Sequence, residues 1–441
     1  MRKRHIAVGA ILVTGALLLA GCSSTGGTTT SSTINTTVNG KGKTLTMWDY
    51  EGDTSAMGVA WKAAIKEFEK ETGAKVKFEA KSFEQIQSTA SQVLNSNSAP
   101  DVMEYNKGNA TAGLLSSEGL LTNLNAAVKA YGWDKDLSSS LQTTAKYDAK
   151  GVMGSGNYYG IPNYGEFVMV YYNQDLFKKY NVTVPTTFSQ FEKALATFKA
   201  AGLTPLSESA VEYPLGQLFY QLAISHATRQ WVTDYQTYTG KVDFHDSDFT
   251  FAANTLKSWV DKGYISKDAT GMKAQDAGDA FQGGKNPIFY SGSWWYGTFQ
   301  AGIKNFKWGT FLFPGSTMAP GSSGNLWVVP SKAKNKDLAY KFIDITMSKK
   351  IQNLMGNNGG IPVAADASSI TDTKSKELIA NFNTLTKRDG LAFYPDWPTS
   401  TFYDQINAGL QELVNGTKSS DQVLTELGTE YAAGVKQITG K

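Results

Sequence analysis

Short β-prone segments alternate with amphipathic helical segments from Leu45 onward, and this alternation limits the possible folds more than any other feature of the 441-residue sequence. Apolar side chains recur with period two in some segments and at helical spacing in others. The pattern predicts strands over 45–48, 75–80 and 100–105 and helices over 59–71 and 83–95. In the second of these strands, Val76 and Phe78 are expected to face inward. Strand–helix repetition of this kind is typical of an α/β fold with a parallel sheet.

The rest of the chain continues the same pattern. The sequence predicts a strand over 167–172 and helices over 175–180, 339–347, 351–355, 402–414 and 423–435, with another helix starting after residues 185–187. No internal repeat and no second linker is found, so we expect two lobes wound from one chain. In parallel sheets ligands bind at the carboxyl ends of strands, where residues 50–53 and 105–108 fall.

The N-terminus has the layout of an export signal. Arg2, Lys3 and Arg4 precede an apolar run from Ile6 to Ala20, which is shorter than the roughly 20 residues that a membrane-spanning helix needs. We therefore expect residues 1–21 to be a signal peptide.

Cys22 directly follows this segment and is the single cysteine of the sequence, which excludes intramolecular disulfides and cysteine-based metal sites. The residues Leu19-Ala20-Gly21-Cys22 resemble the lipobox of bacterial lipoproteins. That resemblance implies a lipidated Cys22 at the mature N-terminus, anchored to the cell membrane on its outer side. Ser, Thr, Gly and Asn dominate the next residues, so 22–44 are expected to form a flexible linker.

Charge and motif content exclude several classes of function. Arg2, Lys3 and Arg4 account for the net charge of +3, so the processed chain would be neutral and would have no global field to hold nucleic acid. His226 and His245 lack the spacing of a metal site, and no metal or cofactor is expected. Aromatic residues are the unusual part of the composition, at 12% of the chain with 10 Trp and 21 Tyr.

Four motifs occur in an order that matches a known family. They are Tyr159-Gly160-Ile161-Pro162 followed by Tyr171-Tyr172-Asn173-Gln174-Asp175-Leu176-Phe177, then Pro185-Thr186-Thr187-Phe188, then Phe281-Gln282-Gly283-Gly284-Lys285 with Gly292-Ser293-Trp294, and Gly359-Gly360-Ile361-Pro362. In this order the chain resembles the maltose-binding-protein-like group of extracellular solute-binding proteins, the sugar-binding lipoproteins of carbohydrate ABC importers.

The resemblance implies a two-lobed periplasmic-binding-protein type II fold with the ligand cleft between the lobes. One lobe is expected over 45–163 plus 315–362 and the other over 164–314 plus 363–441. The implied function is to capture a sugar, expected to be an oligosaccharide, by closing the lobes and to deliver it to a membrane permease. The protein is then a monomeric receptor and not an enzyme.

A sugar ligand is expected to contact aromatic and carboxylate side chains, because pyranose faces stack on rings and hydroxyl groups need hydrogen-bond partners. The family resemblance implies ligand contacts for Glu166, Trp294, Tyr105, Asn106 and the Glu212–Tyr213 pair, and an aromatic at 402–403. Position alone adds Glu51 and Asp53 after the first strand, Trp295, Trp327, and Asp396–Trp397 in a proline-flanked loop. Each has a structural alternative: a solvated turn for Glu51 and Asp53, a surface ion pair for Glu166, and the core for Trp295 and Trp327.

Two other functions stay open at this point. A receptor of the same fold could bind a polyol, a polyamine or a glycerophosphodiester, which would need an acidic cleft or an anion-binding helix end. An extracellular glycoside hydrolase would need two carboxyl groups flanking the scissile bond.

Overall fold

The computed structural model describes residues 34–440, and the predicted signal segment, Cys22 and the linker up to residue 33 lie outside this range. The last part of the predicted linker does not extend freely. Ile34 and Val38 pack against the hydrophobic core, and the backbone N–H of Gly40 donates to the carbonyl of Thr72 at 2.8 Å. Packing on the body therefore begins before the first strand.

The first sheet has five strands in the order β2-β1-β3-β12-β6. Its strands are β1 (Thr44–Asp49), β2 (Lys75–Ala80), β3 (Val102–Tyr105), β6 (Ile161–Pro162) and β12 (Leu326–Val328). β1 runs parallel to β2 and β3, whereas β12 is antiparallel to β3 and β6. The three strands predicted from the N-terminal pattern are confirmed.

One prediction for this sheet is wrong. Phe78 was expected to face inward, but its exposed fraction is 42%. β2 is the edge strand of the sheet, so no further strand covers its outer side. Edge strands bury less of each residue than central ones, and sequence alternation does not reveal which strand is at the edge.

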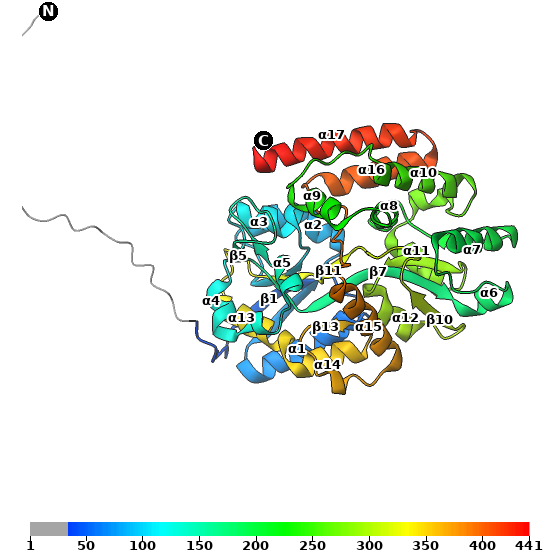
Figure 1. The fold of residues 1–441 in the computed structure, drawn as a ribbon. Helices are drawn as coiled ribbons and strands as arrows, with labels where there is room; N and C mark the ends of the chain where they lie inside the picture. Colours follow the sequence, from blue (N-terminus) through cyan, green and yellow to red (C-terminus); the bar gives the residue numbers. More distant parts are fainter. Residues whose placement is uncertain (1–33, 441) are drawn as a thin grey trace, which may run out of the picture. The chain divides into compact units, whose positions relative to one another are not determined.

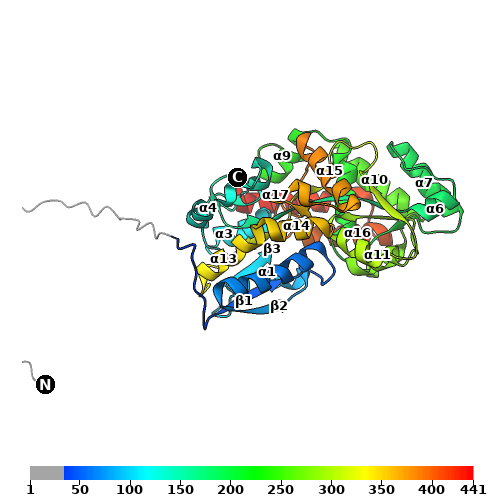
Figure 2. The ribbon, with the colours of Figure 1, turned by 90° about the horizontal axis from the view of Figure 1, so that it is seen from below.

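Helices cover this sheet where the hydrophobic spacing placed them. They are α1 (Ala56–Thr72), α2 (Phe83–Leu94), α13 (Lys336–Met347) and α14 (Lys349–Asn357). α1 starts at Ser55, whose Oγ accepts from the N–H of Gly58, and ends at Gly73 with φ of 71°, the left-handed conformation that glycine adopts without strain. α1 packs against α13 and α14 on one side of the sheet (Figure 2).

The second sheet is built around the long strand β7. Its strands are β7 (Tyr164–Asn173), β8 (Leu206–Ser207), β9 (Ile288–Gly292), β10 (Trp308–Phe311), β11 (Gly321–Ser323) and β13 (Ile361–Pro362). β7 is antiparallel to β9 and β10, and β8 runs parallel to β9. β7 crosses the centre of the fold in Figure 1.

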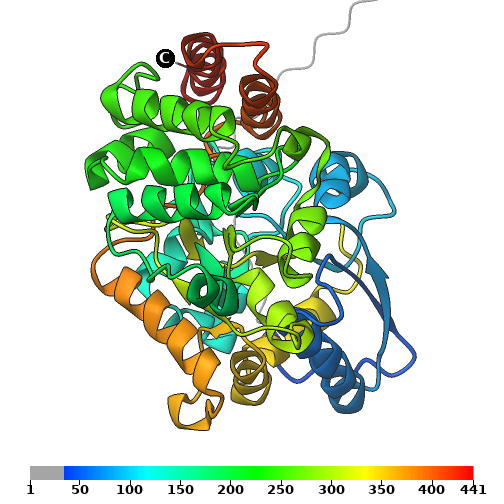
Figure 3. The same cartoon turned by 90° about the vertical axis from the view of Figure 1, so that its right-hand side faces the viewer.

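The helices that accompany the second sheet come from three parts of the chain. They are α6 (Gln174–Lys179), α7 (Phe188–Ala200), α8 (Pro214–Ile224), α9 (Arg229–Thr237), α10 (Ser247–Asp261), α11 (Ala274–Gln282), α12 (Trp294–Gly302), α15 (Thr373–Lys387), α16 (Phe402–Asn415) and α17 (Ser420–Thr439). α8 is buried along its whole length. It packs on α10 and α16, and α16 packs on α17, which gives the stack of helices in Figure 3.

Short elements connect β3 to β6. They are α3 (Leu114–Ser117), α4 (Asn125–Tyr131), α5 (Ser139–Thr143) and the β4–β5 pair (Lys146–Tyr147 and Asn157–Tyr158). The chain then leaves the first sheet after Pro162 and enters the second at Tyr164. Later in the sequence, β11 and β13 pair with β7 in the second sheet, whereas β12, which lies between them in the sequence, belongs to the first sheet. The chain therefore passes between the two sheets several times near β7. The predicted lobe boundaries remain a prediction. None of the helices within residues 34–440 has the length and hydropathy required to span a bilayer.

Candidate ligand-binding site

A cavity of about 830 Å³ lies where the two sheets meet. The first sheet supplies the segments that follow the carboxyl ends of its parallel strands: Glu51 comes after β1, Phe83 opens α2 after β2, and Asn106 comes after β3. Glu166 projects from β7 on the other side. This is the edge at which open α/β sheets bind ligands, because the strand ends and helix starts converge there.

Aromatic rings form much of the cavity wall. Tyr50 meets Phe83 edge-on with ring centroids 5.4 Å apart, and Phe83 meets Tyr213 at 6.4 Å. Tyr213 in turn contacts Trp294 edge-on at 5.6 Å, and Trp294 lies 6.4 Å from the ring of Tyr394. The Nε1–H of Trp294 donates to the hydroxyl of Tyr213 at 3.1 Å. This bond fixes the indole, since a donor in an apolar wall needs a partner.

A buried ion pair lies in the floor of the cavity. Lys107 and Glu166 form it, and their side chains are only 3% and 5% exposed. The ammonium of Lys107 also donates to Oδ1 of Asn325 at 3.0 Å. Asn325 donates to the hydroxyl of Tyr164, and that hydroxyl donates to Glu104 at 3.1 Å. This floor network, Glu104–Tyr164–Asn325–Lys107–Glu166, links β3 to β7.

Burial raises the pKa of the carboxyl groups that lie beside the network. Burial raises the pKa of Glu51 to about 8, against the opposing hydrogen bond from Ser55. Burial likewise raises the pKa of Asp49 to about 7 and that of Asp396 to about 6, the latter in spite of the nearby charge of Lys107. The pKa of Glu104 is also raised, first by burial and then by the charges of Glu51 and Asp49. A protonated carboxyl group can donate as well as accept a hydrogen bond.

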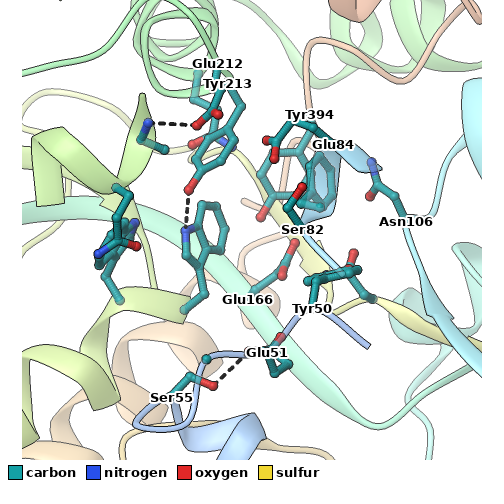
Figure 4. Close-up of a pocket in the computed structure, with 18 of the residues that line it drawn as sticks. Tyr50, Glu51, Ser55, Ser82, Glu84, Asn106, Glu166, Glu212, Tyr213 and Tyr394 are labelled. Carbon is teal, nitrogen blue, oxygen red and sulfur yellow. Dashed lines mark hydrogen bonds between the residues drawn. The ribbon is translucent and has the colours of Figure 1, made fainter. Parts of the chain in front are cut away.

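Several buried polar atoms of the lining have no hydrogen-bond partner among the described residues. They include the hydroxyl groups of Tyr50 and Tyr403 and Oε1 of Gln217. An unpaired buried polar group costs free energy. A ligand that offers hydroxyl groups would satisfy these atoms, and the rings beside them would cover its apolar faces. Figure 4 shows Tyr50, Glu166 and Tyr394 directed toward the same space.

The chain was compared with known protein families. Residues 51–353 match the model of the bacterial extracellular solute-binding proteins. The chain belongs to this family. The sequence resemblance is thereby confirmed at the level of the family, and the cavity at the strand ends is the candidate site of a solute-binding protein.

Relatives of this solute-binding protein include proteins that are named for the saccharides they bind. A maltooligosaccharide ABC transporter solute-binding lipoprotein of Streptococcus pneumoniae serotype 4 is 24% identical over 413 residues, which covers 90% of each chain. Diacetylchitobiose binding protein DasA of Streptomyces coelicolor is 27% identical over 333 residues, or 73% of each chain.

A solved structure has the same fold. It comes from work on xylan utilization by Caldanaerobius polysaccharolyticus and superposes with a TM-score of 0.77 at 22% identity, covering 88% of this chain and 99% of that one. The two-lobed α/β fold class predicted from the sequence is confirmed.

Nine of the twelve predicted ligand residues of this solute-binding protein line the cavity. These are Glu51, Asn106, Glu166, Glu212, Tyr213, Trp294, Trp295, Asp396 and Trp397. Trp295 occupies both of its predicted environments, since it lines the cavity and also stacks on Phe299 at 5.4 Å. Glu212 is held in place by the N–H of Ala274, which donates to it at 2.8 Å. Contact between these residues and a ligand remains a prediction.

Three predicted residues do not line the cavity. Tyr105 shares a face of β3 with Met103 and is buried in the core, because alternate residues of a strand point to the same side. The side chain of Asp53 is 84% exposed and pairs with Lys62 at 2.7 Å. Trp327 is buried and meets Trp61 and Phe342 edge-on, so its core alternative is correct.

Sequence reasoning missed other lining residues, above all Lys107, Asn325, Phe83 and Tyr394. Phe83 could have been found, since it opens the helix that follows β2 at the same edge as Asn106. No local pattern identifies Lys107 as buried, because lysines are usually exposed. Of the aromatic pair expected near the start of α16, Tyr403 lines the cavity and Phe402 is in the core.

No cluster of three or more His, Cys, Asp or Glu side chains suited to a metal ion occurs within residues 34–440. His226 lies edge-on to the ring of Phe251 at 4.5 Å, and His245 pairs with Asp421 at 3.2 Å. The two histidines therefore contact different neighbours.

Proposed function

We propose that this protein binds an uncharged oligosaccharide in the cavity and delivers it to an ABC permease outside the cytoplasm. The observation that carries the proposal is the combination of aromatic walls with buried, unpaired hydroxyl and amide groups in one cavity of about 830 Å³. Clefts with apolar walls and a few polar groups are the usual form of a small-molecule site. The names of the relatives point to the same ligand class.

The charges in the cavity disfavour an anionic ligand such as a glycerophosphodiester. Lys107 is the buried cation of the lining, and it is already committed to Glu166 and Asn325. Lys273, the other lining cation, is exposed to solvent. A phosphate would therefore meet Glu51 and Asp396 without a free buried cation to oppose them.

Ligand capture would proceed by a shift toward a closed state. Phe83 comes from the first sheet, and it contacts Tyr213 and Tyr403 from elements of the second sheet. A ligand favours closure only through contacts that the closed state adds. The lobes that move would be 45–163 plus 315–362 and 164–314 plus 363–441. The receptor would act as a monomer.

The export and anchoring steps belong to the same proposal. Signal cleavage before Cys22 and lipidation of its thiol would attach the body to the membrane through residues 23–33 and the segment that packs from Ile34. Two acyl chains are enough for stable anchoring, whereas one is marginal.

A cationic ligand such as a polyamine is the second candidate. The carboxyl groups of Glu51, Glu84, Glu212 and Asp396 line the cavity alongside the Lys107–Glu166 pair, and an ammonium ligand could pair with them. Proton release distinguishes the two ligand classes. A cation would displace the proton that burial holds on Glu51, whose pKa is about 8, and calorimetry at pH 7 in buffers of different ionisation enthalpy would detect that release.

Thermal unfolding of the purified protein against maltotriose, xylotriose, diacetylchitobiose, spermidine and glycerophosphocholine tests the proposal. A ligand that binds only the folded state stabilises it by about 2.7 kcal/mol at a hundredfold excess over Kd. A shift with one saccharide class supports the proposal, and a shift with spermidine alone supports the second candidate. The same assay mixture, analysed for shorter sugars, tests hydrolysis: turnover would mean that the protein is an enzyme.

A further inference from the structure

Lys107 stands out in the cavity floor because it is a buried cation that faces several carboxyl groups yet forms an ion pair with one of them. Lys107 lies two positions beyond the end of β3, and Glu166 lies in β7, so the ion pair joins the two sheets. Asn325 accepts a second bond from the same ammonium. The ammonium also lies 5.2 Å from the ring centroid of Tyr394 and 5.6 Å from that of Trp397, within the range of cation–π attraction.

These contacts leave little of the Lys107 charge available to a ligand. A lysine ammonium has three donors, of which Glu166 and Asn325 take two, while two aromatic rings face the charge. Glu166 gains from the arrangement, since a buried carboxylate costs free energy unless a cation pairs with it. The ion pair therefore presents an ionised acceptor in the floor with no net charge.

We propose that Lys107 is a positioning and specificity residue: by neutralising and orienting Glu166, it makes the floor of the cavity selective for uncharged saccharides over carboxylated ones. The proposal rests on the proposed function, since it describes how the same site discriminates among sugars. A uronate-bearing saccharide would bring a second negative charge beside Glu166, and Lys107 cannot neutralise both. Sugars with hydroxyl groups alone would find an ionised acceptor already in place.

The preference for neutral over carboxylated saccharides should change when either member of the Lys107–Glu166 ion pair is replaced. Glu166→Gln keeps the size of the side chain and its hydrogen-bonding capacity but removes its charge, which leaves the ammonium of Lys107 buried beside the ligand without its carboxylate. Such a cation should favour a carboxylate on the ligand. Lys107→Met has the opposite effect, because it leaves Glu166 as a buried, uncompensated anion.

The test uses the purified full chain and two matched pairs of probes: maltotriose and xylotriose, each beside its uronate-capped counterpart. We expect the wild type to prefer the neutral member of a pair, and Glu166→Gln to shift the ratio of affinities toward the uronate by at least about tenfold. Lys341→Met is the matched control. Lys341 forms a partly buried ion pair with Glu71 at 3.0 Å, outside the cavity, and its replacement should leave the ratio unchanged. An unchanged ratio in Glu166→Gln would overturn the proposal.

A second readout separates positioning from a general loss of structure. Lys107→Met should lower the unfolding midpoint and weaken binding of the neutral sugar at pH 7, with partial recovery of both at lower pH as the carboxyl groups facing the lost ammonium take up protons. Asp396 in the 394–397 loop, whose pKa burial raises to about 6, takes up its proton in that range. Glu166 on β7 is the other carboxyl group that faces the ammonium, and Glu51 and Glu104, further along the network, have pKa values that burial already raises. The double variant Lys107→Met/Glu166→Gln should be more stable than Lys107→Met alone. Strictly additive losses would overturn the proposal.

Failure of the proposed function gives a different result. If the wild type binds neither neutral sugar, the proposed function is wrong for these sugars. In that case a gain of uronate binding in Glu166→Gln still supports the role of the ion pair. The absence of such a gain overturns that role.

Discussion

Replacing Trp294 with alanine is expected to weaken saccharide binding strongly. Trp294 begins α12, directly after β9, and its ring is partly exposed in the cavity wall. A tryptophan presents roughly 150–250 Å² of surface, and covering about 60 Å² of it with a sugar face is worth about 1.5 kcal/mol. Loss of the bond from its Nε1–H to Tyr213, which lets that ring move, adds about 1 kcal/mol. The sum, about 2.5 kcal/mol, corresponds to a roughly 60-fold increase in Kd.

Isothermal titration calorimetry of Trp294→Ala against the best saccharide of the thermal panel measures this loss. Trp231→Ala is a matched control. Trp231 is also partly buried and donates through its Nε1–H, to Asp246 at 2.7 Å, but it does not line the cavity. Trp231→Ala is expected to lose stability without losing affinity. Wild-type affinity in Trp294→Ala would refute the placement of the sugar against this ring.

Three further predictions concern protonation, packing and anchoring. The folded-state pKa of Glu51, about 8, exceeds its ordinary value of 4.5. Between these two pH values the native state holds a proton that the unfolded chain releases. The contribution of Glu51 to the free energy of unfolding therefore falls as the pH rises from about 4.5 to about 8. Urea unfolding of Glu51→Gln should therefore depend less on pH in that window than the wild type does, and an identical slope would contradict the assignment. A Cβ on Gly292 would lie 2.0 Å from the ring of Trp294, so Gly292→Ala should displace that ring and weaken saccharide binding in calorimetry. Gly271→Ala is the control and should leave binding unchanged, because a Cβ on Gly271 would have no neighbouring atom within 4 Å. Cys22→Ser should move the protein from the membrane fraction to the soluble fraction of cells, and retention in the membrane would exclude the lipid anchor.

The elements of the fold could be predicted well from local patterns. The helix over 59–71 is observed as Ala56–Thr72, and the strand over 75–80 has the predicted bounds, because hydrophobic spacing and the Gly73 cap act over a few residues. The exposure of Phe78 could not be predicted, since it depends on which strand is at the edge of the sheet. The packing of Ile34 and Val38 on the core was missed for a related reason: two apolar residues in a polar stretch give no periodic signal.

The candidate site could be predicted in part, and the successes share a cause. Glu51, Asn106 and Glu166 lie at strand ends or in a strand whose position the motifs fixed, so sequence order alone placed them near one another. Tyr105 lies in the core although Asn106 lines the cavity, because one step along a strand reverses the direction of the side chain. For Trp327, the choice between cavity and core depended on its packing against Trp61 and Phe342, which the sequence does not give. Lys107 was missed because its burial depends on Glu166, which is 59 residues away.

The most direct measurement of the central claim is a crystal structure of the protein with the saccharide that gives the largest thermal shift. We expect the sugar to lie in the cavity, with a pyranose face against Trp294 and a hydroxyl group within hydrogen-bond distance of Glu166. A saccharide bound outside the cavity, or one that leaves Trp294 and Glu166 without contact, would contradict it.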